Sequence, residues 1–117
     1  MSKPVLYMLN TWHDAPDQGP FYCPDCGVVE GFFIYNPKIK EQVDIIHVDF
    51  QRPRPEIIEQ LGEENQASPV LVLPDDSVFF DGIKKSMTTG KSFIDDSLSI
   101  CNFLAQTYNG ILPHPQD

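Results

Sequence analysis

The sequence predicts one α/β domain over residues 1–117, with a mixed four-stranded sheet and helices on both of its faces. Short apolar or β-branched runs alternate with segments of helical spacing, in the order β-α-β-α-β-β-α. A helix separates the first two runs, which favours a parallel pair of strands with a right-handed crossover. Only turn residues separate the last two runs, which favours an antiparallel hairpin and therefore a mixed sheet.

The first third of the chain supplies a strand, a loop and a helix. Pro4–Leu9 is an apolar run that is too short for a stable helix, so we expect a buried strand there. Residues 10–21 contain Asn, Asp, Pro and Gly, which are typical of a loop. The next segment is predicted to form a helix, because Pro24 suits its first turn and apolar residues recur at helical spacing up to Asn36-Pro37.

The middle of the chain supplies the second strand and a short helix. Val43–Val48 is β-branched and partly alternating, which is typical of a strand. Pro55–Leu61 opens with proline and an acidic residue and closes at Gly62, which favours a short helix. This helix is expected to connect the second strand to the third.

The last third of the chain is predicted to form a hairpin and a final helix. Val70–Leu73 is a continuous apolar run, as expected for a strand that is buried on both faces. Val78–Phe80 is expected to pair back on this strand after a turn, and residues 81–93 are expected to form a polar loop. Asp95 or Asp96 is expected to cap the final helix, whose apolar positions recur at roughly helical spacing.

Composition and charge exclude several classes of function. The chain is 41% hydrophobic and 21% charged, which indicates a globular protein and not a disordered one. Its net charge of −9 comes without a basic cluster and argues against a nucleic-acid partner, because phosphate affinity depends on Lys and Arg. There is no apolar run of the roughly 18 residues that a membrane helix needs, and no signal peptide is evident, so we expect a cytoplasmic protein without a membrane partner.

The three cysteines are Cys23 and Cys26, which form a C-x-x-C pair, and the isolated Cys101. An odd number of cysteines without a signal peptide does not describe a disulfide framework, so the pair is expected to be redox-active or metal-binding. At the start of a helix, free backbone N–H groups would favour a Cys23 thiolate, and Cys26 would lie one turn away to resolve a mixed disulfide. A structural zinc site normally needs four protein ligands, and the sequence has no second C-x-x-C and no H-x₃₋₅-H.

The order of the expected elements, together with three short stretches, resembles the thioredoxin superfamily, and this resemblance spans most of the chain. Tyr22–Cys26 resembles the C-P-x-C motif of glutaredoxins. Ser68–Val70 matches the place where the superfamily keeps a cis-proline facing the cysteines. Phe93–Ile100, followed by Phe103-Leu104, is similar to the acid-capped last helix of glutaredoxins and of glutathione-transferase N-terminal domains. The expected fold is therefore thioredoxin-like.

A closer resemblance is to a family of small thioredoxin-like proteins known only as a domain of unknown function. Residues 21–26, residues 62–66 and the Pro-His-Pro of residues 113–115 support this resemblance. One departure from glutaredoxins is that residues 11–22 contain no Lys or Arg, whereas glutaredoxins usually place a Lys there to hold a glutathione carboxylate.

The resemblance implies a thiol–disulfide oxidoreductase that acts on protein or small-molecule thiols and disulfides. Such an enzyme requires no organic cofactor, and glutathione or a thioredoxin reductase could supply its electrons. The implied residues are catalytic Cys23 and Cys26, and substrate-binding Tyr22, Pro24, Ser68, Pro69, Val70, Asp95 and Asp96. Two alternatives stay open, namely a non-catalytic binding adaptor and a metal or iron–sulfur site at the cysteine pair.

Charged residues near the expected site suggest two further roles. Glu30 follows Cys26 by four residues, where a carboxylate could relay the proton of the resolving thiol, although an exposed helix Glu is the simpler interpretation. Five basic residues lie in loops expected at the end of the sheet that carries the cysteine pair. They predict a scattered basic rim that attracts anionic thiol substrates. These basic residues are Arg52, Arg54, Lys84, Lys85 and Lys91.

Overall fold

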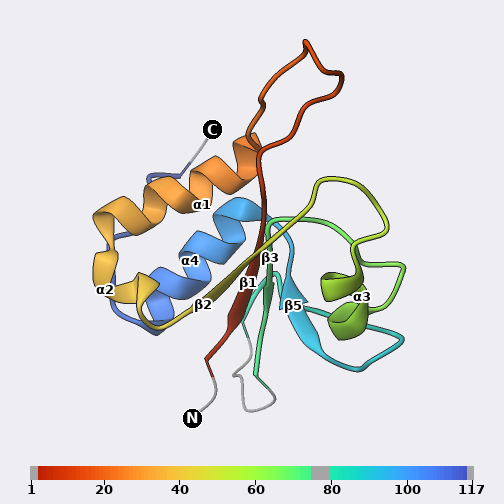
Figure 1. The fold of residues 1–117 in the computed structure, drawn as a ribbon. Helices are drawn as coiled ribbons and strands as arrows, with labels where there is room; N and C mark the ends of the chain where they lie inside the picture. Colours follow the sequence, from red (N-terminus) through yellow and green to blue (C-terminus); the bar gives the residue numbers. More distant parts are fainter. Residues whose placement is uncertain (1–2, 75–79, 116–117) are drawn as a thin grey trace.

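A mixed sheet of five strands in the order β2-β1-β3-β5-β4 lies at the centre of the computed structural model (Figure 1). The structure describes residues 3–74 and 80–115. The strands are β1 (Val5–Leu9), β2 (Asp44–Val48), β3 (Val70–Val72), β4 (Lys84–Lys85) and β5 (Ser92–Ile94). The helices are α1 (Pro24–Tyr35), α2 (Pro37–Lys40), α3 (Pro55–Leu61) and α4 (Ser97–Thr107).

The sheet is mixed because β1 pairs in parallel with β2 and antiparallel with β3. In the parallel ladder Met8 lies beside His47, and in the antiparallel ladder Leu6 lies beside Leu71. The predicted parallel pairing of the first two strands is therefore confirmed. Strand β1 occupies an interior position in the sheet, which agrees with the burial of its three middle residues.

The prediction of four strands is wrong, because the sheet has five. On the side away from β1, β3 pairs antiparallel with β5, whose Ser92 and Phe93 belong to the segment predicted as a polar loop, and β4 pairs with the outer edge of β5. The predicted strand Val78–Phe80 falls largely on residues 75–79, which lie outside the described residues. Strand β4 consists of two exposed lysines, so its sequence shows no hydrophobic alternation from which a strand could be predicted. Charged residues on such a short edge strand commonly protect a sheet against edge-to-edge pairing with another molecule.

Helices cover both faces of the sheet (Figure 1). On one face, alternate residues such as Leu6 and Leu71 pack with α1 and α4 in one core cluster. On the other face, Tyr7 and Val70 pack with Ile57 of α3 in a second cluster. This alternation follows from the two-residue period of a strand, which sends successive side chains to opposite faces.

Helix boundaries agree closely with the sequence signals. Helix α1 begins at Pro24 and α3 spans Pro55–Leu61, as predicted. Helix α2 was missed, because the Asn36-Pro37 pair was interpreted only as a stop signal. Proline is well suited to the first turn of a helix, so the same pair ends α1 and begins α2.

Among the residues that the structure describes, no helix combines the length and the apolar character needed to cross a bilayer.

Candidate functional site

The cysteine pair lies where β1, the long loop of residues 10–22 and the start of α1 meet. Figure 1 shows this loop projecting beyond the end of β1 and returning to the first turn of α1. Backbone hydrogen bonds of 3.1 Å and 2.7 Å between Trp12 and Phe21 close the base of the loop. The loop therefore returns the chain to the sheet immediately before Cys23.

Cys23 is the N-cap residue of α1. Its Sγ accepts a hydrogen bond from the backbone N–H of Cys26 at 3.2 Å, and its carbonyl accepts from Gly27 at 2.9 Å. Pro24 occupies the first helical position, where a missing N–H leaves no hydrogen bond unmade. The sulfur of Cys23 thus occupies the place that a capping oxygen takes in most helices, where the N–H of Cys26 and the helix dipole favour negative charge on it.

Cys26 lies one turn further along α1 and is more deeply buried. Its Sγ accepts a hydrogen bond from the backbone N–H of Leu9 at 3.5 Å. Burial raises the pKa of the Cys26 thiol to about 12; the Leu9 hydrogen bond opposes this rise, and the neighbouring Cys23 thiol adds to it. At neutral pH Cys26 is therefore a protonated thiol.

Ser68 and Pro69 approach the cysteine pair from the start of β3. The Ser68 hydroxyl donates to the carbonyl of Tyr7 at 2.8 Å, and its Oγ lies 3.9 Å from the Sγ of Cys26. The Ser68–Pro69 peptide bond is cis, and Val70 is buried as the first residue of β3. The structure therefore brings Ser68 against the cysteine pair, although 42 residues separate it from Cys26.

A buried arginine holds the segment before Ser68 in place. Arg54 is 6% exposed, and its guanidinium donates to the carbonyl of Phe50 at 2.7 Å and to the carbonyl of Gln66 at 2.7 Å. The ring of Trp12 stacks on Phe50 with a centroid separation of 4.2 Å. These contacts connect the loop before Cys23 with the segments on both sides of α3.

A pocket of about 530 Å³ opens beside the two cysteines. Glu30 of α1 and His47 of β2 line it, together with the exposed side chain of Tyr22. The remaining lining residues are Met8, Leu9, Asn10, Thr11, Cys23, Cys26 and Gly27. Glu30 is expected near the cysteines from its spacing to Cys26, whereas no local sequence pattern singles out His47. The parallel register of β1 and β2 places His47 here, and only knowledge of that pairing could have revealed it.

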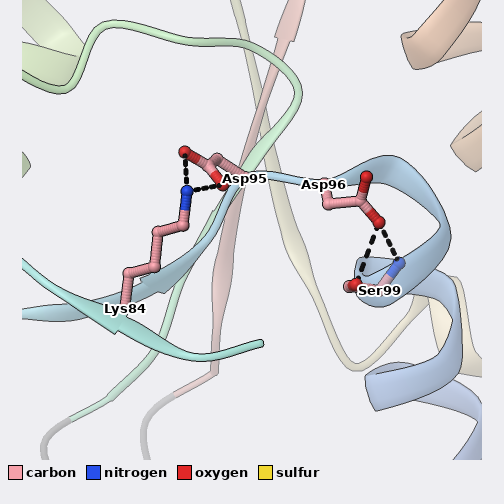
Figure 2. Close-up of polar contacts among 4 residues, drawn as sticks. All are labelled: Lys84, Asp95, Asp96 and Ser99. Atoms are coloured by element: carbon pink, nitrogen blue, oxygen red, sulfur yellow. Dashed lines mark hydrogen bonds and ion pairs between the residues drawn. The ribbon is translucent and has the colours of Figure 1, made fainter. Parts of the chain in front are cut away.

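Asp95 and Asp96 make contacts of their own and are absent from the lining of this pocket. Figure 2 shows the carboxylate of Asp95 paired with the Nζ of Lys84, at 3.0 Å for the nearer oxygen. Asp96 caps α4, since its Oδ2 accepts from the N–H and the hydroxyl of Ser99 at 2.9 Å each (Figure 2). The register of β3 and β5, continued by one residue, sets Asp95 opposite Val70, at the same edge of the sheet as the cis-proline.

The different contacts of these two acids predict different losses of stability. Asp96→Ala is expected to lower the free energy of unfolding by about 1 kcal/mol, because α4 loses its N-cap. Asp95→Ala is expected to cost less than about 0.5 kcal/mol, because its pair with the exposed Lys84 is a surface ion pair. Urea unfolding of both variants tests the order, and equal losses would contradict this assignment of the cap.

The predicted basic rim does not form around this pocket. None of the described residues that line it is Lys or Arg. Lys84 pairs with Asp95, Lys91 contacts the side chain of Gln60, and Arg54 is buried against backbone carbonyls. Within the described ranges, no group of three or more His, Cys, Asp or Glu side chains is arranged to hold a metal ion.

Comparison with known proteins identifies a family for this chain. No curated protein and no solved structure gives a significant match. The family described as "Protein of unknown function (DUF3088)" matches residues 3–111, which include every strand and helix and the whole of the site above. This agrees with the resemblance to a small domain of unknown function that the sequence showed. The chain therefore belongs to the DUF3088 family.

Proposed function

We propose that this protein is a thiol–disulfide oxidoreductase of the glutaredoxin or thioredoxin type, with Cys23 as nucleophile and Cys26 as resolving thiol. The single observation that carries the proposal is that Cys23 caps α1 through its sulfur, with Cys26 one turn away in the same pocket. A thioredoxin-like fold is part of the proposal. Its support is the parallel β1–β2 pair joined through α1 and the cis-proline that begins β3 near the cysteines.

The two thiols differ in a way that assigns their order of reaction. Cys26 keeps its proton at neutral pH because burial raises its pKa to about 12, so it is a poor initial nucleophile. Cys23 lies at the N-terminus of α1, where its Sγ accepts the N–H of Cys26 and the helix dipole favours negative charge on the sulfur. The first attack on a substrate is therefore assigned to Cys23.

The proposed reaction has two exchange steps. The Cys23 thiolate attacks one sulfur of a substrate disulfide, so that a mixed disulfide forms, the substrate S–S bond breaks, and one substrate thiolate leaves. The Cys26 thiol then attacks the Cys23 sulfur, which forms the Cys23–Cys26 disulfide, and its proton passes to the second substrate sulfur, which leaves as a thiol. The substrate gains two electrons and the cysteine pair loses two, and an external thiol such as glutathione restores the reduced pair.

Ser68 is suited to assist the second step. A hydrogen bond between its Oγ and the Cys26 Sγ, which lie 3.9 Å apart, lowers the pKa of Cys26 and so favours the loss of the thiol proton as Cys26 attacks Cys23. The segment of Ser68 and cis-Pro69 also lies at the start of β3, where the proposal places the backbone of an extended substrate.

Replacement of Cys26 by Ser tests the function directly. The variant is expected to stop after the first step and to hold a stable mixed disulfide on Cys23 when it is treated with bis(2-hydroxyethyl) disulfide. Intact-mass and peptide mass spectrometry would show one adduct per chain, located at Cys23. Wild-type protein under the same treatment should instead yield the internal Cys23–Cys26 disulfide.

The control is Cys23→Ser, in which no adduct should form at Cys26. An adduct confined to the buried Cys101, or no adduct at all, would contradict the proposed function. The second result would favour an adaptor, for which the exposed rings of Phe21 and Tyr22 beside the pair offer a contact surface.

A further inference from the structure

The described residues that line the pocket beside the cysteines include one carboxylate, that of Glu30, and no Lys or Arg. His47 is the lining residue among them that can gain a positive charge. Asn10, which also lines the pocket, donates a hydrogen bond to Asp49 at 3.3 Å, which brings a second carboxylate near the lining. The local charge therefore has the same sign as the net charge of −9 of the whole chain.

Four basic residues that the sequence suggested for a rim are absent from the lining of this pocket. Lys84 and Lys85 form β4, at the edge of the sheet opposite the β1–β2 pair that borders the pocket. Lys91 contacts Gln60 at the C-terminal end of α3. The charge of Arg54 acts on Cys23 and Cys26, but its guanidinium is buried and donates its hydrogen bonds to carbonyl oxygens.

We infer that the substrate of this site is a small disulfide that carries an ammonium group, in preference to an anionic disulfide such as that of glutathione. This inference rests on the proposed oxidoreductase function and names the class of substrate for it. A cationic group would gain from Glu30 at the pocket and from the field of the whole acidic molecule, whereas a carboxylate would be repelled by both.

Size and spacing fit such a substrate. A volume of about 530 Å³ lies in the range of small-molecule sites. Glu30 follows Cys23 by seven residues along α1, which at the helical rise of 1.5 Å per residue is about 10 Å. An aminoethyl arm on a sulfur bound to Cys23 would extend toward this carboxylate, while Met8 and Leu9 offer an apolar wall for its methylene groups.

Three disulfides of similar length and different charge test the inference. Cystamine carries two ammonium groups, bis(2-hydroxyethyl) disulfide is neutral, and dithiodiglycolate carries two carboxylates. For each, kcat/KM is measured at about pH 8, above the range in which histidine side chains ordinarily titrate. The value is divided by the rate of the same disulfide with free dithiothreitol, which removes the intrinsic reactivity of the probe. The normalised order expected is cystamine, then the neutral disulfide, then dithiodiglycolate.

The variant Glu30→Gln shows whether the pocket carboxylate causes this order. It is expected to lower the ratio of the normalised cystamine and dithiodiglycolate values by about threefold, the size of a partly exposed ion pair. The matched control is Glu56→Gln, which removes an exposed Glu from α3 on the other face of the sheet and should leave the ratio within error. Salt at about 0.5 M should reduce the ratio in the wild type and reduce it less in Glu30→Gln, which keeps only the field of the remaining charges.

The outcomes separate the inference from the proposed function. Exchange with all three disulfides at equal normalised rates, or a preference for dithiodiglycolate, overturns the substrate class and leaves the oxidoreductase intact. An equal loss of ratio in Glu56→Gln and Glu30→Gln also overturns it, because the preference would then come from net charge alone. Absence of enzymatic exchange with every probe overturns the proposed function itself.

Discussion

Replacing Leu104 with Ala is expected to lower the free energy of unfolding by about 2–5 kcal/mol. Leu104 is fully buried in α4, where it belongs to the core cluster that joins α1, α4 and one face of the sheet. The truncation removes apolar contact and leaves a cavity that tight packing on three sides prevents from closing. Urea unfolding of the reduced protein, analysed by linear extrapolation, measures the change.

The matched control for this prediction is Leu112→Ala. Leu112 lies in the C-terminal segment and is 53% exposed, so its truncation should change the stability by no more than about 0.5 kcal/mol. A loss below about 1 kcal/mol for Leu104→Ala would show that α4 does not pack on α1 as described. The result bears on the site, because α4 supports the helix that carries Cys26.

Elements with strong local signals were predictable from the sequence. Helix α3 begins at Pro55, whose ring suits the first turn, and ends at Gly62, whose φ of 87° is unfavourable for other residues. Strand β1 was evident from an apolar run that is too short for a helix. In these cases the residues that set the boundary are adjacent in sequence to the element itself.

Strands β4 and β5 were not predictable, because their stability comes from pairing and not from local pattern. Ser92–Ile94 is three residues long, which is too short to show alternation, and it forms a strand because Leu71 and Val72 lie antiparallel to it. Lys84–Lys85 forms a strand only because it pairs with the outer edge of β5.

In the candidate site, too, residues with local signals were predictable and contacts between distant segments were not. Cys23 and Cys26 were evident because their spacing is local. The contact between Cys26 and Ser68 was expected only through a family resemblance, since it joins residues far apart in the chain. The prediction for Arg54 is wrong. A place in the basic rim is expected for it, but its guanidinium is buried, because the carbonyls of Phe50 and Gln66 accept its hydrogen bonds.

Raising the pH from about 9 to about 11 is expected to destabilise the reduced protein strongly. Burial raises the pKa of Cys26 to about 12 and that of Cys101 to about 11, whereas a thiol in the unfolded chain ionises near pH 8.5. Burial also raises the pKa of Tyr7 and of Tyr108, so these groups act in the same direction.

The sign of this effect follows from proton counting. Below about pH 8.5 both states hold the thiol protons, and the stability is fully present. Above that pH the unfolded chain loses protons that the folded protein keeps, so the free energy of unfolding falls by about 1.4 kcal/mol per pH unit for each buried thiol. The loss continues until the folded thiols themselves ionise, near pH 11 for Cys101 and near pH 12 for Cys26.

The variant Cys101→Ala isolates one of these contributions. Cys101 is buried in α4 and has no part in the proposed exchange, so its removal should leave the Cys23–Cys26 reaction in place while it reduces the pH dependence. Urea unfolding at a series of pH values between about 8 and about 11, in excess reductant, should show a slope smaller by about 1.4 kcal/mol per pH unit in the variant. Comparison of slopes separates the titration from the small cavity that the truncation creates, because the cavity shifts every point equally. Parallel curves for the two proteins would mean that Cys101 ionises as readily in the folded protein as in the unfolded chain, which would contradict its burial in the core.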